Sequence, residues 1–186
     1  KTPARYSDLK AGNPIQNQFS HTDLYAAYPD MNPSLTTVDR GTGVYRHDEN
    51  KLGIMPVFQR DRYNNKKHYD TAVSGQRSTT IHELQHGVQS REGFGRGGSP
   101  DGDDAAAYAG YRRLSGETEA RTAEARKNMT AAERIARPRW LDYDVPEANQ
   151  IVRFGDGDLQ NSIGSAGGDK PRGVVGSAGG SLAPDA

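Results

Sequence analysis

The sequence contains no cysteine among its 186 residues and only one tryptophan. The absence of cysteine excludes disulfide bonds and thiolate ligands for a metal. No apolar run approaches the roughly 18 residues that a membrane-spanning helix needs, and no apolar segment near Lys1 resembles a signal peptide. The 24 basic and 24 acidic side chains cancel. This balance argues against a dedicated nucleic-acid-binding protein, because such proteins usually carry a basic excess.

Large apolar residues are scarce as well. Leu, Ile, Val and Phe together number 28, which is about 15% of the chain and below the ~20% at which intrinsic disorder is considered. Disorder of a whole chain usually also requires a high net charge, and here the net charge is zero. We therefore expect one folded domain with a thin hydrophobic core that some other interaction supplements.

Composition divides the chain into a domain over 1–154 and a flexible, Gly/Ser-rich tail or linker over 155–186. The string GSAGG occurs twice in the second part, at 164–168 and at 176–180. Such a segment buries too little apolar surface to offset the entropy of ordering it. Because the chain begins with Lys1 rather than methionine, we also expect it to be a piece of a longer polypeptide.

Short β-prone runs, separated by turn residues, predict a small twisted sheet over 36–58. Further along, Ile81, Leu84 and Val88 repeat at helical spacing, and the hydroxyls of 78–80 predict that this helix begins there. Three smaller predictions complete the outline. They are a helix over 24–29 that Pro29 ends, a capping box of Thr130 and Glu133 that opens a short C-terminal helix, and packing of Trp140, Ile151 and Phe154 against the domain.

The most informative stretch is His82-Glu83-Leu84-Gln85-His86. On a helix, His82 and His86 lie one turn apart on the same face, so both imidazoles can reach one metal ion. Glu83 is rotated by about 100° from His82, where its carboxylate can act as a general base toward water. Two histidines and one more protein ligand leave tetrahedral zinc an open position, which is typical of catalytic sites. The motif predicts zinc (Zn2+) at His82 and His86, with Glu83 as the catalytic residue.

The third ligand must come from another part of the chain. Glu117 and Glu119 open the next predicted helix, and residues two apart on a helix cannot face one ion together. Ala120 lies one turn from Glu117, and a small residue there allows this helix to pack closely on the first. This favours Glu117 as the metal ligand, with Glu119 as the alternative. Either residue could instead be a solvated glutamate, and Glu119 would then pair with an arginine such as Arg112, Arg121 or Arg126.

Other side chains with relevant chemistry have simpler interpretations. Tyr108 and Tyr111 precede Glu117 and could stabilise an oxyanion, but packing of their rings is the simpler expectation. His21, His47 and His68 lie in loop-rich sequence and are expected to be surface or capping residues.

The combined pattern resembles a metallopeptidase-like domain found in large polyvalent proteins of phages and conjugative elements. The resemblance covers roughly 7–154, and its residues are 80–89, Glu92-Gly93-Phe94, Gly97-Gly98 and the helix 116–121. It implies a zincin-like fold of gluzincin type, with Glu117 as third ligand. In the wider pattern, the position of Arg121 often holds a side chain that orients a ligand histidine. Arginine cannot accept an imidazole N–H, so this role is expected of Glu119, Glu124 or a backbone carbonyl.

These observations together predict an α+β, zincin-like metallopeptidase with a small sheet, two metal-site helices and a short C-terminal helix. The expected function is zinc-dependent hydrolysis of a peptide or protein substrate, within a larger phage or mobile-element polypeptide whose other domains are its partners. The expected location is the bacterial cytoplasm or the phage virion. The alternative is a non-catalytic module of a virion or ejected complex, in which zinc only stabilises the fold. A nucleic-acid partner is disfavoured by the zero net charge.

Overall fold

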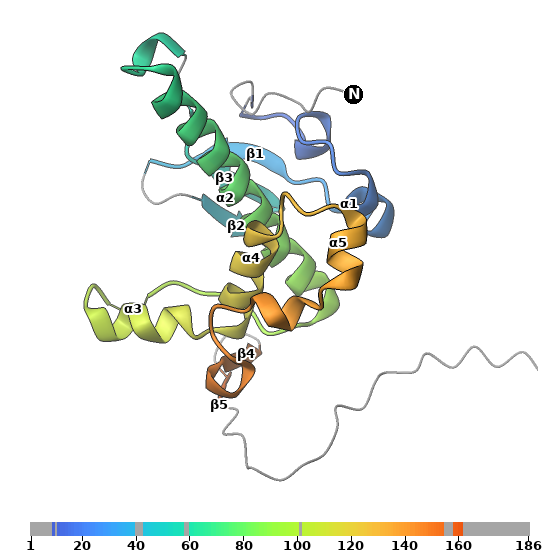
Figure 1. Cartoon of the computed structure of the whole chain (residues 1–186), viewed down its shortest axis with the longest axis vertical. Coiled ribbons are helices and arrows are strands. Elements are labelled where there is room, and N and C mark those ends of the chain that lie inside the picture. The colour runs from blue at the N-terminus through green and yellow to red at the C-terminus, as the bar shows by residue number, and fades with distance from the viewer. Residues whose placement is uncertain are drawn as a thin grey trace, which may run out of the picture.

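The computed structural model describes residues 9, 11–39, 43–57, 60–100, 102–154 and 158–161. These residues form two small sheets and several helices, which confirms the predicted α+β class (Figure 1). The strands are β1 (Ser34–Thr37), β2 (Gly43–Arg46), β3 (Lys51–Ile54), β4 (Ile151–Phe154) and β5 (Asp158–Asn161). The α-helices are α1 (Thr22–Ala27), α2 (Lys66–Glu92), α3 (Ala105–Arg112), α4 (Ser115–Ala125) and α5 (Ala131–Ala136).

The first sheet has the order β1-β3-β2, with β1 parallel and β2 antiparallel to the central strand β3. The turn between β2 and β3 includes Asn50, whose φ of 45° lies in the left-handed region that asparagine tolerates. Ile54 ends β3, the central strand of this sheet. The hairpin places β2 on one side of β3 and the crossover from β1 fills the other, so β2 is an edge strand among the described residues.

Helix α2 begins much earlier than the sequence indicated. Asn65 is its N-cap, because the side chain of Asn65 accepts a hydrogen bond from the backbone N–H of His68. The predicted start at 78–80 is wrong: Thr80 lies inside the helix, and its hydroxyl donates to the carbonyl of Gln76 at 2.8 Å. The first turns of α2 project beyond the sheet (Figure 1). They lack an apolar repeat because they have little to pack against, and so the periodicity of the sequence misses them.

The hydrophobic core is small, as expected. It lies between the sheet, α2 and the segment that precedes β1, and its buried members are Ile15, Phe19, Met31, Leu35, Tyr45, Leu52, Ile54 and Leu84. The interface between α2 and α4 is different, because several of its most buried side chains are polar, among them Gln89, Glu117 and Thr118. Buried polar groups need hydrogen-bond partners, so this second interface depends on a specific polar network.

The C-terminal part is attached by ion pairs and by hydrogen bonds to the backbone, among them Ile151 N–H to the carbonyl of Arg113 at 2.7 Å. Arg126 pairs with Asp142, and Arg121 pairs with Asp144 at 2.8 Å. The expectation that Trp140 packs inward is wrong: its side chain is 60% exposed, and Phe154 is 46% exposed. Ile151 is partly buried and pairs with the backbone at Arg113 and Leu114, so of the three residues it alone faces the domain.

Two boundaries complete the description. The predicted capping box at the start of α5 is confirmed, since the side chain of each member bonds the backbone of the other. Strand β5 lies inside the segment that we expected to be a tail, and it pairs with β4. The rest of that segment, 155–157 and 162–186, lies outside the described residues, as does Phe58 at the end of the predicted sheet.

Candidate metal centre

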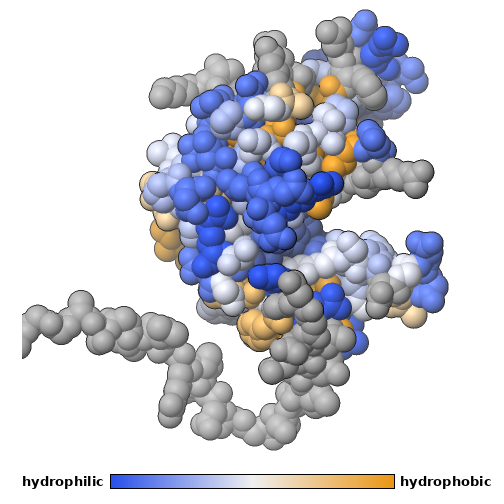
Figure 2. All heavy atoms as spheres, turned by 180° about the vertical axis from the view of Figure 1, so that it is seen from behind, coloured by the Kyte–Doolittle hydropathy of each residue, from blue (hydrophilic) through white to orange (hydrophobic). Residues whose placement is uncertain are grey.

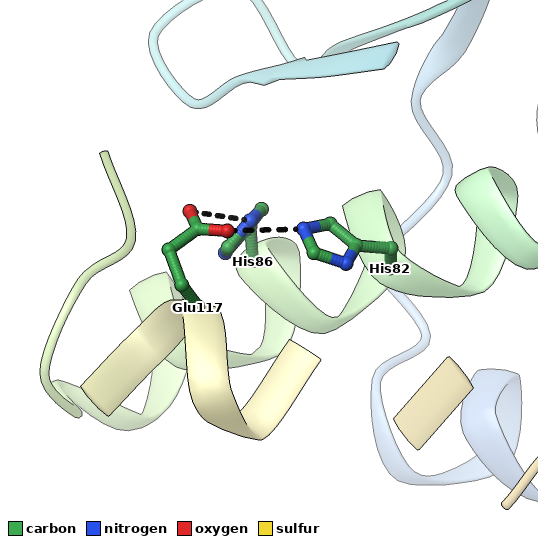
Figure 3. Close-up of side chains that lie close together, drawn as sticks. All are labelled: His82, His86 and Glu117. Atoms are coloured by element: carbon green, nitrogen blue, oxygen red, sulfur yellow. Dashed lines mark hydrogen bonds and ion pairs between the residues drawn. The ribbon is translucent and has the colours of Figure 1, made fainter. Parts of the chain in front are cut away.

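Three side chains from two helices meet between α2 and α4 (Figure 3). His82 and His86 lie one turn apart on α2, and each directs Nε2 at the carboxylate of Glu117 on α4. The Nε2 atom of His82 is 3.2 Å from Oε2 of Glu117, and that of His86 is 3.3 Å from Oε1. One donor atom from each of the three residues lies within 4.8 Å of the others. This group could hold a metal ion.

Small residues allow the helices to approach closely enough for this contact. Ala120, one turn from Glu117 on α4, is completely buried. Gly116 precedes Glu117, and a Cβ atom there would lie 2.3 Å from the backbone nitrogen of Gly97. The absence of a side chain at Gly116 therefore lets the backbone of the loop that carries Gly97 pack directly against the start of α4, beside Glu117.

Glu117 is surrounded by hydrogen-bond donors. Its carboxylate accepts from the backbone N–H of Gly98 at 3.0 Å and from the hydroxyl of Tyr111 at 2.7 Å, in addition to contacting both imidazoles. Burial alone would raise the pKa of Glu117, but the donors from His82, His86 and Tyr111 outweigh burial and hold the pKa well below its usual range. The carboxylate is thus kept ionised, which is the form that binds a metal.

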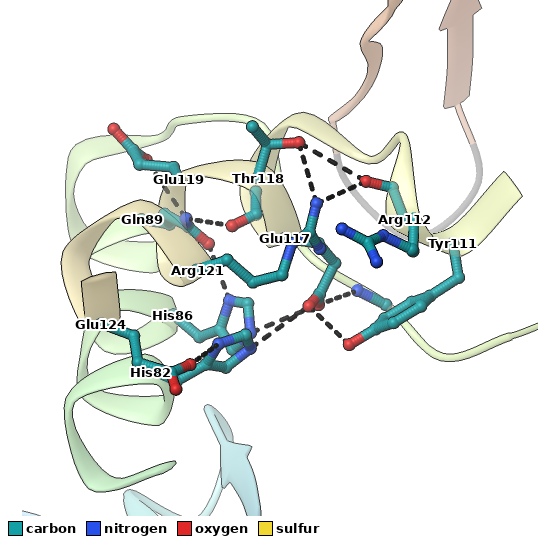
Figure 4. A network of polar contacts seen from close by, with 12 residues as sticks. His82, His86, Gln89, Tyr111, Arg112, Glu117, Thr118, Glu119, Arg121 and Glu124 are labelled. Atoms are coloured by element: carbon teal, nitrogen blue, oxygen red, sulfur yellow. Dashed lines mark hydrogen bonds and ion pairs between the residues drawn. The ribbon is translucent and has the colours of Figure 1, made fainter. Parts of the chain in front are cut away.

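Each imidazole has an acceptor at its second nitrogen, Nδ1 (Figure 4). The Nδ1 atom of His86 lies 2.8 Å from Oε1 of Gln89, and that of His82 lies 3.7 Å from Oε2 of Glu124. Burial alone would lower the pKa of both histidines, but their carboxylate neighbours outweigh this effect, and the pKa of His82 rises to about 9. Outer contacts of this kind orient histidines at metal sites.

Glu83 lies beside the histidines and is not a member of the group formed by His82, His86 and Glu117. Its side chain is buried, 6% exposed, and borders the same cavity as the three candidate ligands. Gly43 on β2 packs against it, since a Cβ atom there would lie 2.9 Å from Oε1 of Glu83. Burial raises the pKa of Glu83 above its usual value. A raised pKa suits a carboxylate that accepts and returns a proton near neutral pH.

Glu119 does not join the three candidate ligands. It accepts a hydrogen bond from Gln89 at 3.1 Å and pairs with Arg139 at 3.0 Å. The arginines we considered as its partners have other roles: Arg112 and Arg121 both bind Asp144, and Arg126 binds Asp142. The structure therefore brings Glu117, and not Glu119, to His82 and His86.

The site opens into a cavity of about 740 Å³. Figure 2 shows the surface hollowed beside the arm that carries α3, on a face that is largely hydrophilic. The cavity lies among β2, the middle of α2, the 96–100 loop and α4. Residues that sequence reasoning missed or took for surface or packing residues also border it, namely His47, Gln89, Arg96 and Tyr111. Gln89 stands at helical spacing from both histidines, one turn beyond His86 on α2, whereas His47, Arg96 and Tyr111 lie on other segments that only the folded chain brings to the site.

The donor set fits zinc chemically. Two neutral imidazole nitrogens and one carboxylate oxygen are a known ligand set for catalytic zinc, and thiolates are not required. Hydrogen bonds already fix the direction of two of these groups: Gly98 and Tyr111 donate to Glu117, and Gln89 contacts His86. A comparison of the chain with models of protein families, with curated proteins and with solved structures finds no match.

Proposed function

We propose that this protein is a zinc-dependent peptide hydrolase with His82, His86 and Glu117 as metal ligands and Glu83 as general base. The observation that carries the proposal is the position of Glu83. It lies buried in the wall of the cavity that the candidate ligands share, and it is not a member of the ligand group. A purely structural metal site gains nothing from an additional buried carboxylate, whose desolvation is costly.

In this proposal, zinc supplies a Lewis acid that makes water a nucleophile near neutral pH. Glu83 takes the proton from that water as it attacks a peptide carbonyl, and then gives the proton to the leaving amine. The raised pKa of Glu83 favours the second transfer because it makes the protonated form accessible. Tyr111 donates to Glu117, so its hydroxyl keeps the ligand carboxylate in place.

The substrate would be an extended peptide. Strand β2 borders the cavity through Gly43, Val44 and Tyr45, and among the described residues it pairs on one side only, with β3. A free strand edge can bind an extended peptide by main-chain hydrogen bonds. Such binding would lay the peptide across the cavity beside Glu83.

The wider setting of the proposal depends on the sequence resemblance. It would make the chain a zincin-like domain of a phage or mobile-element polypeptide, acting on that polypeptide or on a host protein, in the bacterial cytoplasm or the virion. Among the described residues, no helix combines the length and the apolar character needed to cross a membrane. The second candidate function, a zinc-stabilised structural module, is supported by the small core and the polar interface between α2 and α4.

The test separates zinc binding from catalysis. Purified protein should contain about one zinc per chain by elemental analysis and should cleave members of a peptide library. Glu83→Gln should keep the zinc and lose cleavage, because an amide cannot take the proton. His86→Ala should lose both. The matched control is Glu92→Gln, which makes the same change on α2 at a residue that contacts Tyr28 outside the cavity. Unchanged cleavage by Glu83→Gln would contradict the assignment, and zinc without any cleavage would favour the structural module.

A further inference from the structure

Gln89 lies one turn beyond His86 on α2 and is almost completely buried, with 1% of its surface exposed. Its amide makes three contacts. Nε2 donates to the carbonyl of Gly116 at 2.8 Å and to the carboxylate of Glu119 at 3.1 Å, and Oε1 lies 2.8 Å from Nδ1 of His86 (Figure 4). The NH₂ group of Gln89 thus donates both of its hydrogens to acceptors on α4.

The two α4 partners fix which way the amide points. A backbone carbonyl only accepts hydrogen bonds, so the atom that faces Gly116 must be the NH₂ group. The flipped amide would place Oε1 against the carbonyl of Gly116 and near the carboxylate of Glu119, with no hydrogen between them. The orientation of Gln89 therefore follows from chemistry, although N and O of an amide have nearly the same shape.

The orientation of Gln89 in turn fixes the hydrogen on His86. An amide oxygen cannot donate, so Nδ1 of His86 must carry a hydrogen and donate it to Oε1. A neutral imidazole has one hydrogen, and its other nitrogen then presents a lone pair. That nitrogen is Nε2, which faces the Glu117 carboxylate at 3.3 Å. Glu117 is a competing acceptor for the hydrogen of the neutral ring, but its contact is longer than the 2.8 Å contact between Nδ1 and Gln89, so we expect the hydrogen on Nδ1.

We propose that Gln89 is a positioning residue that sets the tautomer of His86, so that Nε2 is available as a metal ligand. The inference rests on the proposed metal site, but the tautomer itself is a property of the metal-free chain. Arg121 cannot take this part, since arginine has no acceptor and its guanidinium is bound to Asp144. Glu119 is a second acceptor for the same NH₂ group, whose direction the Gly116 carbonyl already fixes.

His82 has a different outer contact. Its Nδ1 lies 3.7 Å from the carboxylate of Glu124, which is beyond hydrogen-bond length, and the Glu124 side chain is 36% exposed. The orientation of His86 is thus fixed more firmly than that of His82. A buried amide at 2.8 Å holds His86, whereas a partly exposed carboxylate at a longer distance attracts His82.

The direct test uses ¹⁵N-histidine NMR on metal-free protein, at a pH where His86 is neutral. The shifts of the two ring nitrogens distinguish the nitrogen with a hydrogen from the one with a lone pair. We expect the hydrogen of His86 on Nδ1 in the wild type. A hydrogen on Nε2 would overturn the inference, whatever the protein does with zinc or peptides.

Three variants separate orientation from packing. Gln89→Met keeps most of the volume but removes the acceptor, so His86 should become a mixture of tautomers and zinc affinity should fall by about 10- to 100-fold. Gln89→Glu keeps an acceptor for His86 while losing the donors to α4, so it should lower the melting temperature and keep the Nδ1 hydrogen. The matched control is Glu119→Ala, which removes one partner of Gln89 but leaves Gly116 and His86; it should keep both the tautomer and most of the zinc affinity.

Opposite results in these variants would also overturn the inference. One is an unchanged tautomer in Gln89→Met, which would show that another contact fixes His86. The other is an equal loss of zinc affinity in Glu119→Ala and Gln89→Met, which would reduce Gln89 to a packing contact between the helices. If Gln89→Met fails to fold, the wild-type spectrum still decides the question.

Discussion

At the scale of single residues, protons and a metal ion would compete for the same ligand atoms of the two histidines and Glu117. In the structure, Nε2 of both histidines faces the carboxylate of Glu117, and the pKa of His82 is raised to about 9 by its carboxylate neighbours. In the cationic form of each histidine, Nε2 carries a hydrogen toward Glu117, and a metal must displace that hydrogen before it can bind. The same contacts that keep the three side chains together thus make metal binding depend on pH.

The two neighbouring glutamates of α4 give a prediction at this scale. Glu117→Ala should lose zinc, because it removes the one carboxylate that meets both histidines. Glu119→Ala should keep zinc, because Glu119 contacts Gln89 and Arg139 instead. Competition with a chelator of known affinity measures both. Stronger loss of zinc in Glu119→Ala than in Glu117→Ala would move the ligand role to Glu119.

At the scale of elements, two helices and one loop build the site. Helix α2 supplies the histidines and Glu83, and α4 supplies Glu117. The loop between α2 and α3 lies against both, because Gly98 donates to Glu117 and Gly97 adjoins His86. The loop therefore closes one side of the centre with backbone alone, and a side chain there would occupy the position of the ligands.

Gly97→Ala tests the loop. The added Cβ would lie 2.2 Å from Oε1 of Glu117 and 2.4 Å from Cε1 of His86. Both distances are much shorter than a van der Waals contact, so the neighbouring atoms would have to move. We expect a loss of about 1–3 kcal/mol in unfolding free energy, as for other overpacked sites, together with weaker zinc binding. Gly110→Ala is the control, since nothing lies within 4 Å of its Cβ position on α3.

The control should be neutral, or more stable by roughly 0.5–1 kcal/mol, because alanine suits a helix better than glycine. Denaturant unfolding and chelator competition measure the two effects separately. Equal behaviour of the two variants would show that the loop is displaced easily and does not define the centre.

At the scale of the whole molecule, a small apolar core is joined to a polar interface between α2 and α4. A ligand that binds only the folded chain stabilises it by mass action. Because the candidate ligands come from both helices, bound zinc should stabilise the contact between α2 and α4. Removal of zinc by a chelator should therefore lower the melting temperature.

The effect of chelation should depend on pH. His82 has a pKa of about 9 in the folded chain against an ordinary value of 6.5, so its contribution to metal-free stability is complete below about pH 6.5 and is lost as the pH rises through 9. Glu117, whose pKa is held below the ordinary 4.5, contributes above that value and loses its contribution as the pH falls. Metal-free protein should therefore be most stable, as far as this pair decides, between about pH 4.5 and 6.5.

Zinc affinity should change in the opposite direction, because each proton released makes binding tighter as the pH rises. The difference in melting temperature between zinc-loaded and chelated protein should thus grow from pH 6.5 to pH 9. Differential scanning fluorimetry over this range measures it. A difference that stays constant or shrinks would show that no histidine proton is exchanged for the metal.

The sequence by itself determined those features that depend on neighbours along the chain. The spacing of His82 and His86 and the capping box of α5 follow from the geometry of a single helix, whereas the small residue Ala120 only favoured Glu117 over Glu119. The mixed α+β class followed from short β-prone runs beside helical repeats. These are local properties, so a pattern of a few residues is enough to predict them.

Only the tertiary structure decided what depends on contacts between distant segments. It placed Glu124 beside His82, oriented the amide of Gln89 through contacts with α4, and brought Gly97, Gly98 and Tyr111 to Glu117. The start of α2 escaped the sequence pattern because its first turns project from the domain and need no apolar face. Hydrogen bonds between elements leave no periodic mark in a sequence, and here they decide how the candidate ligands are held.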